Sequence, residues 1–356
     1  MKRLETQKRE LLFAGTVFPA HPLCLNEDRL LDENGQRLLT NYYIESGAGG
    51  VAVGVHSTQF EIRLPQYNLF ERLLKISAEE IDKAKLTRPF IRIAGIVGST
   101  EQAIAEAKLA IAYGYDMGLL SMGGLQELTE SEILRRTEAV AQIIPVFGFY
   151  LQPSVGGRIF SYDFWTKFVN IENVEAIKCA SFNRYQTLDV VRAIANSPRG
   201  EQIALYTGND DNIVADLLSI YRFEVNGSAK EVQFRGGLLG HWAVWTSKAV
   251  ELLQLVKEFK IQPTPEKWRH LQIVGSQTTD ANAALFDVAN DFEGCIPGIH
   301  EVLVRQGLMK GVWCLNPHEV LSDGQSGELT RIHNDYPLLH DDDFVREFLE
   351  RYELQS

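Results

Sequence analysis

The sequence has few cysteines and no long apolar run. Its 356 residues include four cysteines, which lie far apart, without the short spacings of a disulfide framework or a zinc site. No stretch of about 18 consecutive apolar residues occurs, so we expect no membrane-spanning helix and no membrane partner. The first ten residues are mostly charged or polar and lack the apolar core of a signal peptide. Together these absences predict a protein of the reducing cytoplasm.

Basic residues are also scarce relative to acidic ones. The chain has 35 lysines and arginines against 47 aspartates and glutamates, which gives a formal net charge of −12. Nucleic-acid binding depends on basic stripes that neutralise phosphates, so we expect no nucleic-acid partner. The remaining composition, 45% hydrophobic and 23% charged, is that of a globular protein that buries a large core.

Strand and helix patterns alternate about eight times along the first 260 residues. Such alternation is typical of an α/β protein with parallel strands, and eight repeats favour a closed (β/α)8 TIM barrel. An open doubly wound sheet is the alternative, but no Gly-x-Gly-x-x-Gly motif follows the first strand. The expected strands are 11–18, 51–56, 90–97, 117–122, 146–151, 174–180, 203–207 and 232–235.

The alternation stops after the eighth repeat. Beyond residue 260 the apolar periodicity stays helical, and no further strand pattern occurs. We therefore predict a barrel catalytic domain over residues 11–260. Residues 261–356 are predicted to form a C-terminal helical extension packed on the barrel.

Two of the expected strands each carry one polar residue among small neighbours. Tyr150 shares a side of its strand with Gly148, and Lys178 shares a side with Ala176 and Ala180. Lysine is almost never fully buried unpaired. Burial would lower its pKa and free the amine for attack on a carbonyl, and a tyrosine hydroxyl could transfer the protons. The other interpretation is that Lys178 extends to solvent and Tyr150 is a core tyrosine.

The spacing of these two residues resembles that of a known enzyme family. The Tyr-x-x-Pro motif at Tyr150–Pro153, followed by Lys178 28 residues after the tyrosine, resembles the dihydrodipicolinate synthase / N-acetylneuraminate lyase family. Those proteins are class I aldolases and dehydratases on a (β/α)8 barrel. Gly-Thr-Val-Phe-Pro at 15–19 and the glycine-rich run at 236–240 resemble the family's first and eighth strands. The resemblance implies that Lys178 forms a Schiff base with pyruvate or another 2-oxo acid, with Tyr150 as general acid/base.

The resemblance also implies a carboxylate-binding motif after the second strand. The family has Gly-Thr-Thr-Gly-Glu there, whereas this chain has Gly-Val-His-Ser-Thr at 54–58. One alignment places His56 and Ser57 over the threonines, and a shift by one residue places Ser57 and Thr58 there. His56 could also bind a carboxylate, act as an acid/base near neutral pH, or be a core histidine. We therefore predict that His56, Ser57 and Thr58 bind substrate.

Three further places are candidates for substrate binding. Arg158 is the nearest analogue of the family arginine that binds the second substrate's carboxylate, although a solvated loop arginine is the alternative. The turn with Gly208 and Asn209 follows the seventh strand and could supply hydrogen bonds or cap the next helix. Gly236 and Gly237 would allow close approach of the backbone to a ligand, or a tight turn.

One feature of the synthases in this family is missing. They carry a second tyrosine after the fourth strand, which completes a proton relay across a subunit contact. The corresponding stretch here, Leu120–Gly124, has no tyrosine. This departure argues against the synthase reaction proper and against the same relay between subunits.

We therefore predict a Schiff-base lyase, either an aldolase or a dehydratase, that acts on a small-molecule 2-oxo acid. The iminium formed on the lysine itself withdraws electrons from the substrate, so we expect no cofactor and no metal. The resemblance implies a homodimer or homotetramer. One alternative is a barrel hydrolase or isomerase that uses His56 with acids such as Glu61 or Asp210. The other is a barrel without turnover that binds a sugar acid or 2-oxo acid.

Overall fold

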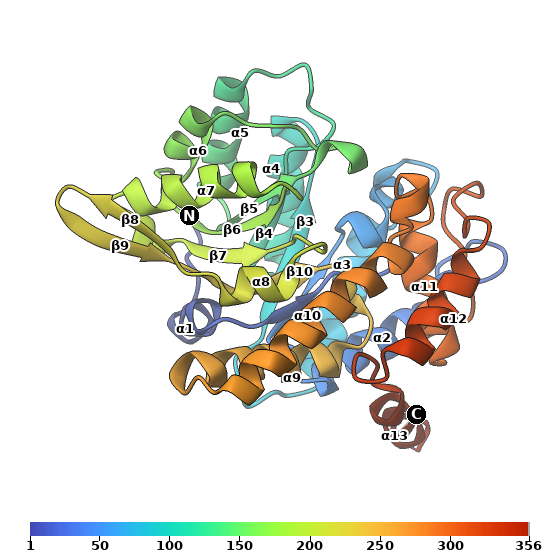
Figure 1. The fold of residues 1–356 in the computed structure, drawn as a ribbon. Coiled ribbons are helices and arrows are strands. Elements are labelled where there is room, and N and C mark those ends of the chain that lie inside the picture. The colour runs from blue at the N-terminus through green and yellow to red at the C-terminus, as the bar shows by residue number, and fades with distance from the viewer. Residues whose placement is uncertain (355–356) are drawn as a thin grey trace. The chain divides into compact units, whose positions relative to one another are not determined.

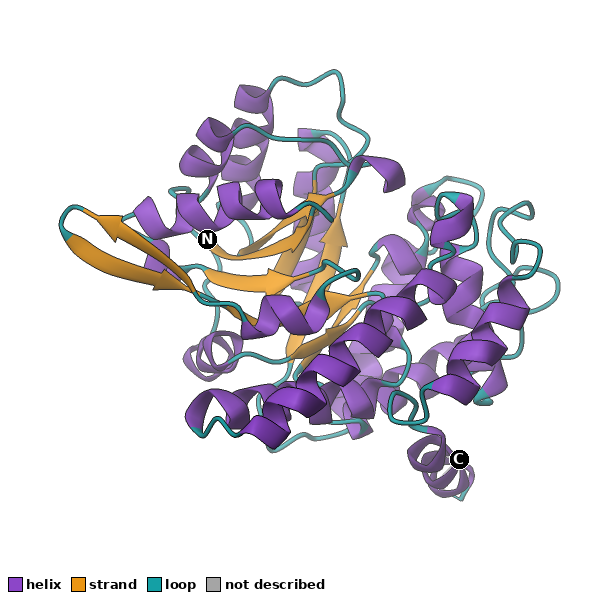
Figure 2. Cartoon of the chain, in the orientation of Figure 1, coloured by secondary structure: helices purple, strands orange, loops and turns teal. Residues whose placement is uncertain are grey.

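The core of the fold is a sheet of eight strands, and Figure 2 draws all strands of the protein in orange. The computed structural model describes residues 1–354. The strands follow the order β1-β10-β7-β6-β5-β4-β3-β2, and a parallel bridge between Ala20 and Ala52 joins the segments of the two end strands. The strands are β1 (Val17–Pro19), β2 (Gly50–Val53), β3 (Ile91–Ile96), β4 (Met117–Ser121), β5 (Val146–Leu151), β6 (Val174–Ala180), β7 (Ala204–Thr207) and β10 (Phe234–Leu239).

A helix follows each of these strands along the chain. The pairings from β3 through β4, β5, β6 and β7 to β10 are all parallel, which confirms the predicted (β/α)8 barrel. The helices are α2 (Glu33–Glu45), α3 (Phe70–Lys83), α4 (Thr100–Ala112), α5 (Glu130–Ala141), α6 (Tyr162–Phe168), α7 (Arg184–Asn196), α8 (Ile213–Leu218) and α9 (Thr246–Ile261).

The chain folds into two compact units. Unit 1 consists of Met1–Thr16 with Ile91–Leu238, and unit 2 consists of Val17–Phe90 with Leu239–Ser356. Unit 2 contains the helices that follow the last strand repeat, which confirms the additional C-terminal helices of the predicted fold. They are α10 (Pro265–Leu285), α11 (Cys295–Arg305), α12 (Gln325–Asp335) and α13 (Asp342–Glu353). The predicted domain boundary after residue 260 stays a prediction.

The N-terminal segment differs from the sequence-based expectation of a strand over 11–18. Residues Thr6–Ala14 form helix α1, and Gly15 ends it with φ 85°. The segment is rich in good helix formers such as lysine, glutamate, leucine and alanine. Within unit 1, the Tyr206 hydroxyl donates to the Leu12 carbonyl (2.8 Å) and accepts from the Thr16 N–H (3.2 Å). These two bonds fasten the end of α1 to strand β7.

A hairpin that the sequence pattern did not lead us to expect precedes the last barrel strand. Strands β8 (Tyr221–Val225) and β9 (Ser228–Val232) pair antiparallel, and Figure 1 shows them as a separate two-stranded ribbon. Asn226 and Gly227 connect them with φ of 52° and 76°, the positive values that a two-residue hairpin turn requires. The expected strand over 232–235 corresponds to the end of β9 and the start of β10.

Strand β5 has two faces with different neighbours. A Cβ atom at Gly148 would lie 2.6 Å from the Phe168 ring of helix α6, so Gly148 faces the helices. Phe147, on the opposite face, packs against Tyr206 with ring centres 5.4 Å apart. Because side chains alternate along a strand and Gly148 faces α6, the even-numbered residues of β5 point to α6 and the odd-numbered ones point inward, where Tyr206 lies.

No helix in the described part of the chain is both long enough and apolar enough to cross a membrane.

The sidedness of β5 predicts that Gly148→Ala is destabilising. The added methyl group would displace the Phe168 ring, and overpacking of this kind costs about 1–3 kcal/mol. Urea unfolding followed by circular dichroism measures the loss. Gly327→Ala is the matched control: Gly327 lies on helix α12 with open space where the methyl would be. There the same change should stabilise by about 0.5–1 kcal/mol. A neutral Gly148→Ala variant would contradict the assigned faces.

Candidate functional site

Lys178 lies on the inner face of strand β6. It is in register with Phe149 of β5 and with Tyr206 of β7, so the three side chains share one face of the sheet. The Lys178 Nζ atom lies 4.2 Å from the centre of the Phe149 ring. The lysine residue is only 9% exposed. Its neighbour Cys179 points the other way and contacts Thr187 of helix α7. The amine is therefore buried on the inner side, opposite the helices.

Burial dominates the electrostatics of this amine. Desolvation lowers the pKa of Lys178 to about 8, and the Asp210 carboxylate opposes that shift by favouring the charged form. The face of the Phe149 ring also favours the cation. Near pH 8 about half of the amines carry a lone pair, which is the form that attacks a carbonyl carbon.

Gly208 gives the lysine its space. A Cβ atom at this position would lie 2.5 Å from Lys178 Cε and 2.9 Å from the Ala180 methyl, so no other residue fits without moving the lysine. The Gly208 N–H donates to the Cys179 carbonyl (2.7 Å) and fixes the turn. Asp210, half-buried, follows two residues later. Gly208 is thus one predicted site residue that the structure places beside Lys178.

Tyr150 is not on the same face as Lys178. It is in register with Cys179, one residue further, and packs in an aromatic cluster between strand and helix. Its ring centre lies 4.9 Å from that of Trp165 on helix α6 and 6.0 Å from that of Phe160. Burial raises the pKa of Tyr150 to about 12. The sequence pattern predicted a shared site for Tyr150 and Lys178, but the strand register directs them to opposite faces, and Phe149 takes the place beside the lysine.

Asn209 has a structural position. Its side chain is fully buried. The amide oxygen accepts the Phe182 N–H (3.0 Å), and the amide nitrogen donates to Asp216 of helix α8 (2.8 Å). These bonds fasten the turn after β7 to the loop after β6. The Asn209 amide therefore already has partners within unit 1.

The predicted carboxylate-binding residues form a short 3-10 helix, η1 (His56–Thr58), in unit 2. Ser57 and Thr58 are buried. The Ser57 hydroxyl donates to the Ala20 carbonyl (2.8 Å) and the Thr58 hydroxyl to the His21 carbonyl (2.7 Å). Both hydroxyls thus connect the end of β2 to the segment after β1. The His56 ring lies 5.9 Å from that of Phe60.

The last predicted binding residues also contact backbone in unit 1. The Arg158 guanidinium donates to the carbonyl groups of Leu128 (2.7 Å) and Leu125 (3.3 Å), so it holds the loop after β4. At Gly236 a Cβ atom would lie 2.2 Å from the Thr16 carbonyl oxygen. Gly237 donates its N–H to that oxygen at 3.4 Å. The two glycines therefore allow close packing of backbone against backbone.

Two residues act directly on the lysine amine: Phe149, which the sequence pattern did not indicate, and Asp210, which it offered only as an acid of the alternative hydrolase or isomerase. Phe149 lies against the amine, and Asp210 acts on its charge. Side chains alternate along β5, so Phe149 and Tyr150 point to opposite faces of the sheet. Which of the two faces Lys178 depends on the register between β5 and β6, and this register shifts at a bulge between Val146 and Phe147. No sequence signal marks that shift.

A parallel (β/α)8 barrel with a buried lysine on its inner face is the class that the fold and this site define. No family model and no curated protein sequence matches the chain. Solved structures, in contrast, match the chain. Dihydrodipicolinate synthase from Oceanobacillus iheyensis aligns with a TM-score of 0.71 at 17% identity, over 93% of this chain and 99% of that one.

N-acetylneuraminate lyase from Fusobacterium nucleatum gives a TM-score of 0.69 at 17% identity, over 91% and 99% of the two chains. CdNal from Clostridium difficile, solved in complex with mannosamine, gives 0.70 at 17% identity over 90% and 99%. The chain therefore has the fold of the dihydrodipicolinate synthase / N-acetylneuraminate lyase structures. The resemblance inferred from the sequence is confirmed at the level of the fold.

The buried position of Lys178 predicts an unusual titration. Carbon-13 NMR of labelled lysine side chains should show one amine with a midpoint near pH 8. Because this pKa lies below the ordinary value of 10.5, the folded state holds fewer protons than the unfolded chain between pH 8 and 10.5, and stability increases with pH there. Asp210→Asn should lower the midpoint further, since it removes the charge that raises it.

Asp211→Asn is the matched control, because Asp211 does not act on the Lys178 amine, whose pKa responds to burial and to Asp210. A Lys178 midpoint above pH 10 would contradict a desolvated amine with a lowered pKa.

Proposed function

We propose that the protein is a lyase that forms a Schiff base between Lys178 and a 2-oxo acid, pyruvate or a related compound. The observation that carries this proposal is the Lys178 amine, buried on the inner face of the sheet with a pKa lowered to about 8. A desolvated amine of this kind is a nucleophile near neutral pH. The solved structures of similar fold include N-acetylneuraminate lyase complexed with pyruvate, which supports pyruvate as the first compound to test.

The chemistry follows from the neutral amine. The Nζ lone pair attacks the ketone carbon to give a carbinolamine, which takes up one proton and loses water to give the iminium. The positively charged iminium withdraws electrons from the adjacent carbon. A carbanion formed there is stabilised as an enamine, so a carbon–carbon bond can break or form at that carbon, or water can be lost beyond it. Product analysis distinguishes cleavage, condensation and dehydration.

We assign the proton transfers to Asp210 rather than to Tyr150. The Asp210 carboxylate is close enough to raise the pKa of Lys178, and it lies in the loop that follows β7, at the carboxyl end of the strands where barrel enzymes have their sites. Tyr150 points to helix α6 and has a pKa raised to about 12. A carboxylate near the amine can take the proton released in one step and return it in the next.

The rest of the predicted function stays a prediction. Binding of the substrate carboxylate by His56, Ser57 and Thr58 stays a prediction. The Ser57 and Thr58 hydroxyls would have to exchange a backbone carbonyl for the ligand. The homodimer or homotetramer and the cytoplasmic location are likewise predictions.

Borohydride trapping tests the Schiff base. Incubation with pyruvate or a longer 2-oxo acid and sodium borohydride should give a stable mass adduct on the peptide that contains Lys178. Lys178→Arg should give none, because a guanidinium does not form the imine. Lys167→Arg, at an exposed lysine paired with Asp163 on helix α6, should keep the adduct. Absence of an adduct with every 2-oxo acid would remove the mechanism, and ligand-dependent melting without product would favour a binding barrel.

A second comparison separates Asp210 from Tyr150. Asp210→Asn should slow imine formation with pyruvate by roughly 100-fold, the size of a general acid/base contribution. A purely electrostatic role would do the opposite, because loss of the carboxylate leaves more of the amine neutral. Tyr150→Phe should trap at nearly the rate of the unmodified protein, since the hydroxyl lies on the other face. Slow trapping in Tyr150→Phe with normal trapping in Asp210→Asn would reverse the assignment.

A further inference from the structure

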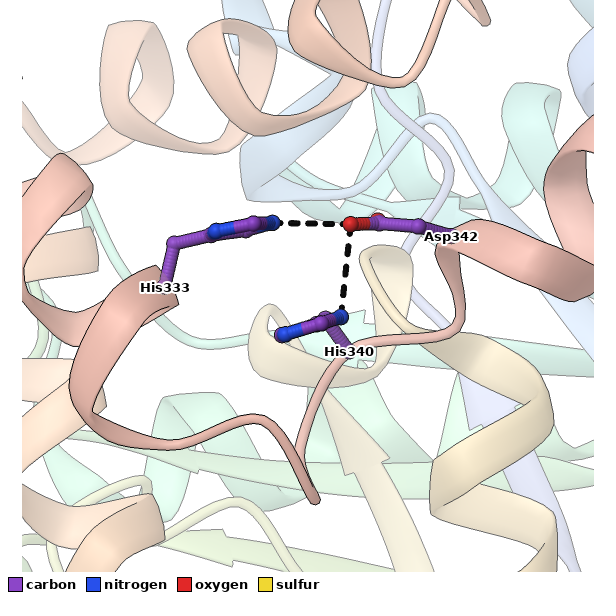
Figure 3. Close-up of side chains that lie close together, drawn as sticks. All are labelled: His333, His340 and Asp342. Carbon is purple, nitrogen blue, oxygen red and sulfur yellow. Dashed lines mark hydrogen bonds and ion pairs between the residues drawn. The ribbon is translucent and has the colours of Figure 1, made fainter.

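Two histidines and an aspartate gather at the junction of the last two helices, within unit 2. His333 lies in the last turn of α12, His340 in the connecting loop, and Asp342 at the start of α13. Figure 3 shows both rings directed at the same carboxylate. His333 Nε2 lies 2.7 Å from Asp342 Oδ2, and His340 Nδ1 lies 3.3 Å from that oxygen. The cluster is half-buried, and His340, at 19%, is its least exposed side chain.

The two histidine rings of the cluster are also in contact with each other. The two imidazoles stack nearly parallel, with centroids 4.2 Å apart and planes 9° from one another, and their nitrogens lie above one another on the side of Asp342 (Figure 3). One ligand atom of each residue lies within 4.8 Å of the others. Because an imidazole binds a metal through a lone pair in the plane of its ring, an ion placed among them would require the stacked rings to turn until their lone pairs converge.

Hydrogen bonds from outside the cluster hold the Asp342 carboxylate in place. Gln306 Nε2 donates to Asp342 Oδ1 and to Asp341 Oδ1, both at 2.9 Å. Asp341 is buried, and its other oxygen accepts from the Tyr42 hydroxyl (2.8 Å) and the Ser247 hydroxyl (3.1 Å). These bonds leave Asp342 Oδ2 directed at the two rings. Partners of this kind, which orient a ligating carboxylate, are typical of metal sites.

A cavity borders the cluster. Its volume is about 340 Å³, and His333, Asp342, Gln306, Arg305 and Trp245 are among its lining residues. Two of the three candidate ligands therefore face open space. An ion held by three protein groups needs such space for a water molecule at its fourth position.

We propose that His333, His340 and Asp342 bind a divalent transition metal, and that the site prefers Zn²⁺. Two imidazole nitrogens and one carboxylate oxygen are a donor set that zinc accepts in tetrahedral geometry with water as the fourth ligand. Hard cations such as Mg²⁺ and Ca²⁺ select oxygen ligands instead. The site joins α12 to α13 through a loop, so bound metal would stabilise that junction. This proposal is independent of the Schiff base on Lys178.

Metal titration of the full-length, tag-free protein tests the site. After removal of metals with a chelator, competition against a chromophoric zinc indicator should show one Zn²⁺ per chain. His333→Ala, His340→Ala and Asp342→Asn should each weaken binding by at least 10-fold, the loss that even an outer-shell partner causes. His318→Ala is the matched control, since His318 is an exposed histidine outside the cluster, and it should bind as the unmodified protein does.

A second measurement distinguishes loss of the metal site from loss of the fold. Co²⁺ in place of Zn²⁺ should give visible absorption bands of tetrahedral cobalt, and these should vanish in the three variants whose circular dichroism is unchanged. Lys178→Arg should keep both signals, so failure of the Schiff-base proposal and failure of this one are distinguishable. The absence of Zn²⁺ binding, or binding that all three variants retain, would overturn the site and leave a hydrogen-bonded His-Asp-His cluster only.

Discussion

The desolvation of one amine is the constraint on which the candidate site depends. Lys178 lies in the middle of strand β6, which is paired with β5 on one side and β7 on the other, and its side chain is buried on the inner face. Burial of an ammonium group has an unfavourable desolvation free energy, and three features of the surroundings accommodate the group. Gly208 leaves room for the methylene chain, the Phe149 ring faces the charge, and Asp210 supplies an opposite one. The resulting amine is poised between its two protonation states.

The same alternation that places Lys178 inside places Tyr150 outside. Strand β5 therefore contributes an aromatic residue to each layer: Phe149 to the interior and Tyr150 to the cluster with Trp165 of α6. A tyrosine in that cluster contributes burial and ring contacts, as aromatic side chains commonly do. The motif that suggested a catalytic pair thus joins one residue of the proposed site to one residue of the outer core.

Most of the fold could be predicted from the sequence, because strand and helix periodicities depend on local patterns. One local signal was nevertheless misread and another was overlooked. The segment Thr6–Ala14 is a helix of good helix formers rather than the start of a strand. The Asn226-Gly227 pair, a strong hairpin signal, separates β8 from β9. For the site, the sequence indicated Lys178 because a lysine is unusual within a buried strand, and Gly208 because it opens the turn after the seventh strand. The roles of Ser57, Thr58 and Asn209 as backbone partners depend instead on contacts with distant segments.

The sequence by itself determined the parallel α/β architecture and marked one lysine as exceptional, since periodicity and residue type are properties of the chain. Only the tertiary structure decided which side chains meet that lysine, because strand register is fixed by packing across the sheet and a single bulge between Val146 and Phe147 changes it. The cluster of His333, His340 and Asp342 is a tertiary property as well. A loop brings its members from two helices to one point, and their spacing in the sequence has no recognisable pattern.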